Sequence, residues 1–214
     1  MYTSQQRDKT LPDLSSTYNG FDFAANVRMA GGGTLFGSWT VERNVSNFCA
    51  NDDNPNGVST ADRYTGVAVF GGAYCDQGAF DMPLRHEFKM AGSVPVRWGI
   101  DVGAVLQSYA GSERIITWAP AAGVFPAPAG RTRTETVMLT EPGSLYYPRY
   151  NQVDFNVKKT FRAGRKTFSG QIDWFNLLNG NAVFTRNSAV GSSLGQIQTI
   201  LQGRLMRLAF QMKW

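Results

Sequence analysis

The chain has 214 residues, of which 43% are hydrophobic, 13% aromatic and only 17% charged. A globular domain usually has about 25% charged residues, so the low charge and the 23 glycines are typical of a β protein that faces lipid. The net charge of +5 comes from scattered Lys and Arg residues, which argues against nucleic-acid binding. A membrane-spanning helix needs about 18 or more apolar residues in a row. No such run occurs, so only a closed barrel could span a membrane.

Residues 1–17 are polar at the start and lack the apolar core of a signal peptide. They are predicted to be an N-terminal extension, either a truncated upstream strand or a loop. Residues 18–214 are predicted to form one all-β unit.

Alternation of apolar and polar residues with period 2 predicts seven strands. They lie at about 18–30, 34–44, 84–90, 96–107, 149–161, 166–175 and 203–214. The clearest alternation is in 96–107, where Val102, Ala104 and Leu106 share one face and Asp101 and Gln107 the other. A strand inside a water-soluble sandwich would show the same pattern.

Short and long connections alternate between these strands. The short turns are at 31–33, 91–94 and 162–165, and the long loops are at 45–82, 108–148 and 176–202. This predicts one antiparallel meander in chain order with an open edge at the first strand. It matches a partial transmembrane β-barrel with short periplasmic turns and long extracellular loops. Because bacterial single-chain barrels have an even strand count, seven strands indicate a fragment.

Three segments resemble a known family. They are EPGSLYYPRYNQVDFNVKKTF, DWFNLLNGNAVF and the terminal RLMRLAFQMKW. They look like the C-terminal strands of TonB-dependent receptors, specifically the Oar-like group with a carboxypeptidase-regulatory-like domain. A weaker likeness extends to YNGFDFAANVRMAGGGTLFGSWTVER and to the pairs Phe48-Cys49 and Tyr74-Cys75.

The resemblance implies an outer-membrane receptor that binds and takes up an extracellular ligand. In that family the barrel, of about 22 strands, is plugged by an N-terminal domain and energised by the TonB complex. Neither the plug nor the TonB-contacting segment precedes Tyr18, so this chain alone is not expected to perform energised uptake. The implied partners are outer-membrane lipid, the remainder of the barrel and the plug. Phe210 and Trp214 are similar to the terminal signal that barrel-assembly machinery recognises.

Cys49 and Cys75 lie in one polar segment, and an even cysteine count is compatible with a disulfide in an oxidising compartment. We expect this disulfide on the extracellular side. No catalytic, cofactor or metal site is predicted, and the chain is not expected to be an enzyme.

Three weaker patterns have plainer explanations. His86 stands on a strand without metal ligands at suitable spacing. Asp154 and Asp173 resemble a carboxylate pair, but polar residues are expected on the lumen side in any case. The segment 52–57 fits the first half of a calcium loop, yet Arg63 stands where a bidentate Glu is needed, so turn chemistry is the default.

Two residue sets describe the expected barrel wall. Aromatic residues near strand ends fit interfacial girdles: Tyr18, Trp39, Trp98, Tyr109, Trp174 and Trp214. Basic residues expected toward the lumen are Arg28, Arg97, Lys158 and Arg207, which could pair with Asp22, Glu42, Asp101 and Asp154. Two alternatives remain open, a surface or adhesion protein without transport and a soluble β-sandwich that binds a ligand.

Overall fold

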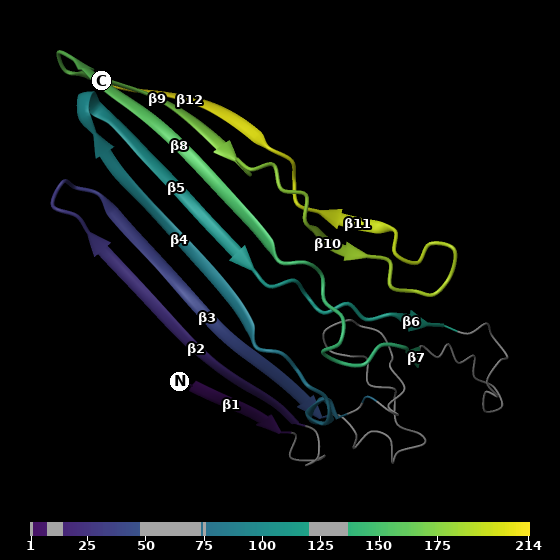
Figure 1. Ribbon diagram of the computed structural model, residues 1–214. Coiled ribbons are helices and arrows are strands. Elements are labelled where there is room, and N and C mark those ends of the chain that lie inside the picture. The colour runs from purple at the N-terminus through teal and green to yellow at the C-terminus, as the bar shows by residue number, and fades with distance from the viewer. Residues whose placement is uncertain (1, 8–14, 48–73, 75, 120–136) are drawn as a thin grey trace.

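The computed structural model of the chain describes residues 2–7, 15–47, 74, 76–119 and 137–214. Eight strands form one sheet in the order β1, β2, β3, β4, β5, β8, β9 and β12 (Figure 1). Their bounds are Tyr2–Arg7, Ser15–Arg28, Thr34–Asn47, Arg85–Val96, Ile100–Tyr109, Tyr150–Ala163, Lys166–Phe175 and Leu205–Lys213. Each neighbouring pair is antiparallel. The predicted antiparallel meander in chain order is therefore confirmed. The predicted open edge at the strand 18–30 is wrong, because β1 pairs with that strand and forms the edge instead.

Two small sheets are inserted into the long connections and leave the order of the main sheet unchanged. β6 (Thr117–Trp118) pairs with β7 (Val137–Met138), and β10 (Val183–Arg186) pairs with β11 (Ile197–Ile200). Single 3₁₀ turns occupy Gln77–Ala79 and Arg97–Gly99.

The main sheet is open. The seven predicted strands correspond to β2, β3, β4, β5, β8, β9 and β12, and β1 from the predicted N-terminal extension pairs with β2. The outermost strands, β1 and β12, lie at opposite edges and do not pair with each other (Figure 1). The described strands are thus one curved wall, not a closed barrel.

The hairpin β4–β5 differs from the prediction. We expected a turn at 91–94, but β4 continues to Val96 and the chain reverses at Arg97–Gly99. Trp98 and Gly99 there have φ values of 63° and 69°. Gly92, which favoured the wrong turn, lies inside β4, where a Cβ would be 2.9 Å from the carbonyl oxygen of Thr34. A glycine is needed at this position because the neighbouring strand approaches closely, and glycine inside a strand often marks such a close approach rather than a turn.

The other two short turns agree with the prediction. Between β2 and β3, the Met29 amide donates to the Gly33 carbonyl oxygen (2.8 Å), and Gly32 has a φ of 84°. Between β8 and β9, Gly164 has a φ of 61°. All three short turns lie at one end of the sheet, here called the turn end, and β3, β5 and β9 end at the other, the loop end (Figure 1).

The described chain has almost no interior of its own. Val41 and Leu201 are its only buried hydrophobic side chains. A soluble domain of this size normally encloses a core of many such residues. The large hydrophobic side chains of the sheet lie instead on an open face.

Candidate functional site

The strand register aligns the apolar residues of seven strands on one side of the sheet, which we call the apolar face. Because successive side chains of a strand point to opposite faces, alternation within each strand becomes a continuous surface only if the register matches across every pair. Here it matches in all six pairs from β2 to β12. The large members are Phe21, Phe23, Val27, Leu35, Trp39, Val41, Phe88, Met90, Val94, Val96, Ile100, Val102, Leu106, Val153, Phe155, Val157, Phe161, Phe168, Ile172, Trp174, Met206, Leu208, Phe210 and Met212.

No other layer of the described chain covers the apolar face. Phe210 is 71% exposed, Leu208 69% and Phe23 57%. Its rings contact one another across strands, as in Phe23 on Trp39 and Phe161 on Phe168, with centroids 5.7 and 5.3 Å apart. Contiguous exposed apolar surface on this scale marks an interaction surface, because it is unfavourable in water.

Charged residues on this side of the sheet stand only toward its two ends, among the described strands. The register places Arg43 toward the loop end and both Lys159 and Lys166 toward the turn end. The register aligns Lys159 of β8 with Ile100 of β5 and thereby with Val96 of β4. Along β4, Val96 is ten residues from His86. At about 3.4 Å per residue this is roughly 34 Å along the strand. Within that band the face is uncharged.

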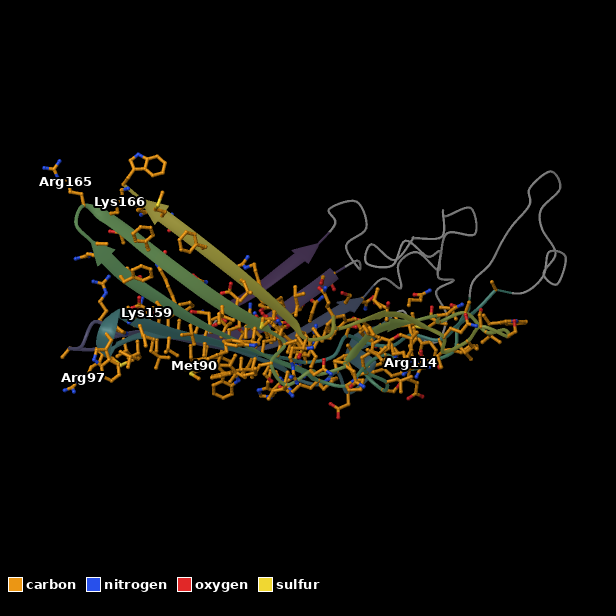
Figure 2. The ribbon with its side chains drawn as sticks, turned by 90° about the horizontal axis from the view of Figure 1, so that it is seen from above. Met90, Arg97, Arg114, Lys159, Arg165 and Lys166 are labelled. Carbon is orange, nitrogen blue, oxygen red and sulfur yellow. The ribbon has the colours of Figure 1, made fainter. Side chains whose placement is uncertain are left out.

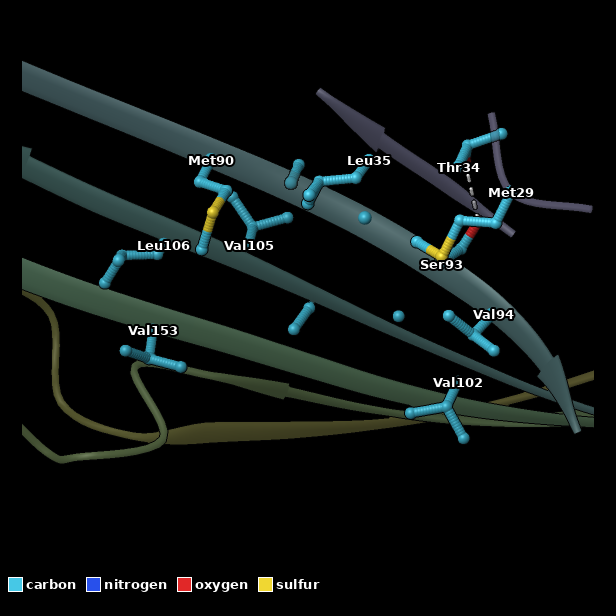
Figure 3. A pocket seen from close by; sticks show the side chains of 14 residues that line it. Met29, Thr34, Leu35, Met90, Ser93, Val94, Val102, Val105, Leu106 and Val153 are labelled. Atoms are coloured by element: carbon cyan, nitrogen blue, oxygen red, sulfur yellow. Dashed lines mark hydrogen bonds between the residues drawn. The ribbon is translucent and has the colours of Figure 1, made fainter. Parts of the chain in front are cut away.

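A shallow apolar hollow of about 270 Å³ lies in the middle of this band. Figure 3 shows Leu35, Met90, Val94, Leu106 and Val153 around it. Its floor is low because the small residues Gly92 and Ala104 lie side by side on β4 and β5. The hollow therefore offers a mostly apolar contact at this place, although Thr34 and Ser93 also line it.

The opposite, polar face carries hydrogen-bonded side chains. Tyr18 donates to Glu42 (2.8 Å), and Arg85 lies 3.9 Å from both Glu42 and Glu87. Lys89 lies over the ring of Tyr109, 5.0 Å from its centroid. These contacts cross from β2 to β5 and pair charges with one another.

The two aspartates that resembled a catalytic pair lie on this face but are held by separate partners. Asp154 accepts from the Gln152 side chain and from the Asn176 amide, each at 2.8 Å. Asp173 is buried and forms an ion pair with Arg207 at 2.9 Å. Arg207 thus pairs with Asp173, not with the acidic residues named from the sequence. The hydrogen bonds give both carboxylates structural partners.

The aromatic residues expected to form girdles divide between the two faces. Trp39 and Trp174 are on the apolar face, while Trp98 and Trp214 lie at the turn end, 79% and 88% exposed. The register places Tyr18 and Tyr109 on the polar face instead. The sequence alone could have shown this, because residues an even number of positions apart in a strand share a face. Tyr18 therefore shares a face with Asp22, and Tyr109 with Asp101.

Three other expected residues can be placed. Arg97 is in a turn and not on the lumen side of a strand. His86 lies on the apolar face, its ring stacked on Trp39 at 6.0 Å. Phe210 is on the apolar face of β12, followed by Trp214. Among the described residues, no group of three His, Cys, Asp or Glu side chains could hold a metal ion.

Two predictions lie outside the described residues. These are the disulfide between Cys49 and Cys75 and the turn, rather than a calcium loop, at 52–57. They stay predictions.

At the loop end, parts of two long connections form an ordered extension of the sheet, at 110–119, 137–149 and 176–204. The Thr117 amide donates to the Ser188 carbonyl oxygen (2.9 Å), and the Arg186 amide donates to the Tyr147 hydroxyl (2.8 Å). Burial, with the nearby Glu113 carboxylate, raises the pKa of Tyr146 above its ordinary value. These segments were expected to be loops, and the contacts that join them were not predicted.

Asn176 anchors this extension to the sheet. It is 2% exposed and has a φ of 50°. Its side-chain amide donates to the carbonyl oxygens of Gly180 (2.9 Å) and Gln202 (2.8 Å), and its carbonyl oxygen accepts from the Gly180 amide (2.9 Å). One side chain thereby joins the two ends of the connection 176–204.

A scan against models of protein families found no match, and a search of curated proteins found no significant similarity. The helical segments that the structure describes include none with the length and hydropathy needed to cross a membrane.

Proposed function

We propose that the chain is a C-terminal part of an outer-membrane β-barrel of the TonB-dependent receptor kind, which binds and takes up an extracellular ligand. The observation that carries the proposal is the uncovered apolar face. Its large hydrophobic side chains lie on seven neighbouring strands, whereas the opposite face carries most of the charged and hydrogen-bonding side chains of the sheet. Lipid outside and a polar lumen inside are the surroundings that this asymmetry fits.

The height of the apolar face supports the same proposal. The uncharged band is roughly 34 Å long along β4, and strands of outer-membrane barrels are tilted by about 35–45°. Tilting the band by that angle leaves about 24–28 Å along the membrane normal, close to the apolar band of about 25 Å in such barrels. A sheet buried in a soluble core needs no such match.

In this proposal the remaining parts have separate roles. Further strands complete the wall at the edges β1 and β12, and a plug domain outside this chain connects to the TonB complex. The extension at the loop end lies where extracellular loops capture ligands. Phe210 and Trp214, exposed on the apolar side and at the turn end, serve barrel-assembly machinery.

The test compares two valines of β5 that lie on opposite faces. Val102 is on the apolar face and Val105 on the polar face. Each is replaced by a spin-labelled cysteine in the same background, with Cys49 and Cys75 changed to serine, and the full chain is reconstituted in bilayers. We expect the label at Val102 to be relaxed by lipid-soluble oxygen and shielded from an aqueous nickel chelate. The label at Val105 should show much less contact with lipid.

A label at Val102 that neither reagent reaches would mean that protein covers the apolar face, as in a soluble β-sandwich, and would overturn the proposal. Uptake is tested separately from membrane insertion. A bilayer-inserted protein whose complete form binds ligand at the surface but does not transport it would instead be an adhesion or surface protein.

A further inference from the structure

Basic side chains are concentrated at the turn end of the sheet. The segments 28–34, 95–101, 158–168 and 211–214 carry eight of them against one acidic side chain, Asp101. They are Arg28, Arg97, Lys158, Lys159, Arg162, Arg165, Lys166 and Lys213. Figure 2 shows Arg97, Lys159, Arg165 and Lys166 together at this end of the molecule. We call these four residues the basic rim.

Two members of the basic rim stand on the apolar side of the sheet. Lys159 pairs with Ile100 and Gly170, and Lys166 pairs with Ala163. A lysine at the border of an apolar surface lays its alkyl chain along that surface and extends its ammonium group to the polar boundary. The Lys159 ammonium donates to the carbonyl oxygen of Trp98 in the adjacent turn, so it is directed toward the turn end.

The contact with Lys159 involves a strained residue. Trp98 has a φ of 63° and a ψ of 30°, a left-handed conformation that is rare for a bulky side chain. Such strain persists only where the surroundings hold it, and it often marks a functional position. Here it directs a mostly exposed indole outward beside the lysine. Indole rings and lysines at the end of an apolar surface are the combination found at a lipid headgroup boundary.

Two arginines of the sheet nearer the loop end have acidic partners within the protein, whereas the members of the basic rim have none among the described residues. Arg85 has Glu42 and Glu87, and Arg207 has Asp173. In the described residues no ion pair includes a member of the basic rim. Four exposed cations are therefore free to bind anions from outside the chain, at the border of a surface suited to hydrocarbon.

From this placement we infer that the basic rim binds the phosphate headgroup of an anionic glycerophospholipid. Lys159 and Lys166 contact the phosphate from the apolar side, and Trp98 lies against the glycerol and upper acyl region. The inference rests on the proposed function, since it needs lipid on the apolar face. Beyond the proposed function, it specifies the class of lipid that is bound and places this lipid in the leaflet next to the short turns.

The test uses the full chain with Trp98 as its single tryptophan, after Trp39, Trp118, Trp174 and Trp214 are changed to phenylalanine. The protein is reconstituted in phosphatidylcholine vesicles that contain either brominated phosphatidylglycerol or brominated phosphatidylcholine. Quenching of Trp98 fluorescence then gives the relative occupancy of the two lipids beside it. One basic residue near a membrane favours anionic lipid by up to about fivefold. We expect phosphatidylglycerol to be preferred several-fold.

The Lys159→Gln, Lys166→Gln double variant should lose most of this preference. The matched control is Arg43→Gln, which removes the cation toward the loop end on the same face and should leave the preference unchanged. Circular dichroism verifies that the variants keep their β structure. Added salt gives a second readout that needs no variant, because screening must reduce the preference of the unaltered lysines.

The outcomes separate the two proposals. If neither brominated lipid quenches Trp98, and the label at Val102 also fails to contact lipid, the proposed function itself fails. Equal quenching by both lipids leaves the membrane proposal standing and overturns the basic rim as a headgroup site. A preference that persists in the double variant or in high salt also overturns it.

Discussion

Single residues matter most where the extension joins the sheet. Asn176 combines a left-handed backbone with three buried hydrogen bonds, and these bonds satisfy backbone groups of Gly180 and Gln202. Asparagine tolerates this conformation better than most residues because its short polar side chain bonds locally. Asn176 therefore both accommodates the left-handed backbone at this position and provides hydrogen-bond partners for the backbone groups of Gly180 and Gln202.

Asn176→Ala should lower the free energy of unfolding by about 2–4 kcal/mol, because buried backbone groups lose their partners. The control is Asn179→Ala. Asn179 is exposed, has a similar φ of 53°, and accepts one bond, from the Arg204 amide at 2.9 Å. Both variants share the backbone penalty, so urea denaturation of the pair isolates the buried bonds. Equal losses for the two variants would contradict the role given to Asn176.

This role could not be predicted from the sequence. The segment NLLNGN contains three asparagines and a glycine, which indicates a loop without showing which asparagine is buried. Lys159 was different, because it shares the parity of Val157 and Phe161 within its strand. A lysine at an apolar parity near a strand end is a readable sign of a polar boundary, and it was overlooked beside the neighbouring Lys158.

At the scale of elements, glycines inside strands have different causes. Gly92 and Gly170 are both on the apolar side, in β4 and β9. A Cβ at Gly92 would lie 2.9 Å from the Thr34 carbonyl oxygen and 3.1 Å from Cδ1 of Leu35, whereas at Gly170 nothing lies within 4 Å. Only the first glycine is required by the approach of the neighbouring strand.

Gly92→Ala should therefore destabilise the sheet by about 1–3 kcal/mol through this clash. Gly170→Ala should be neutral or should stabilise by up to about 1 kcal/mol, since alanine restricts the unfolded chain. Unfolding in detergent, followed by circular dichroism, compares the two. A Gly170 variant as unstable as the Gly92 variant would show that the geometry of the β3–β4 pair is not the cause.

Most strands were predictable because a sheet with one apolar and one polar face requires apolar and polar residues to alternate along each strand. β2, β8, β9 and β12 lie within a few residues of their predicted positions. β1 was missed because residues 2–7, YTSQQR, show no alternation, and β10 and β11 because each has only four residues. The β4–β5 turn was misplaced because Gly92 and Ser93 are typical turn formers, while the actual turn contains a tryptophan.

At the scale of the whole molecule, the missing interior governs behaviour in solution. In aqueous buffer without an amphiphile the chain should associate, because the apolar face has no cover. In micelles it should be a single protein chain surrounded by detergent. Size-exclusion chromatography with light scattering measures both masses. A uniform, detergent-free monomer in buffer would contradict the exposed apolar face and, with it, the proposed membrane surroundings.

The lack of a covering layer also changes what a truncation costs. In a packed core, removing part of a side chain loses its transfer free energy and also leaves a void, which adds about 24 cal/mol per Å³. Phe210 and Leu208 are 71% and 69% exposed, so their truncation leaves space that a surrounding fluid refills. The cost of truncating Phe210 or Leu208 should therefore consist only of the lost transfer free energy. The identities of these side chains are thus loosely constrained as long as they stay apolar, whereas the shapes around Gly92 and Asn176 are not.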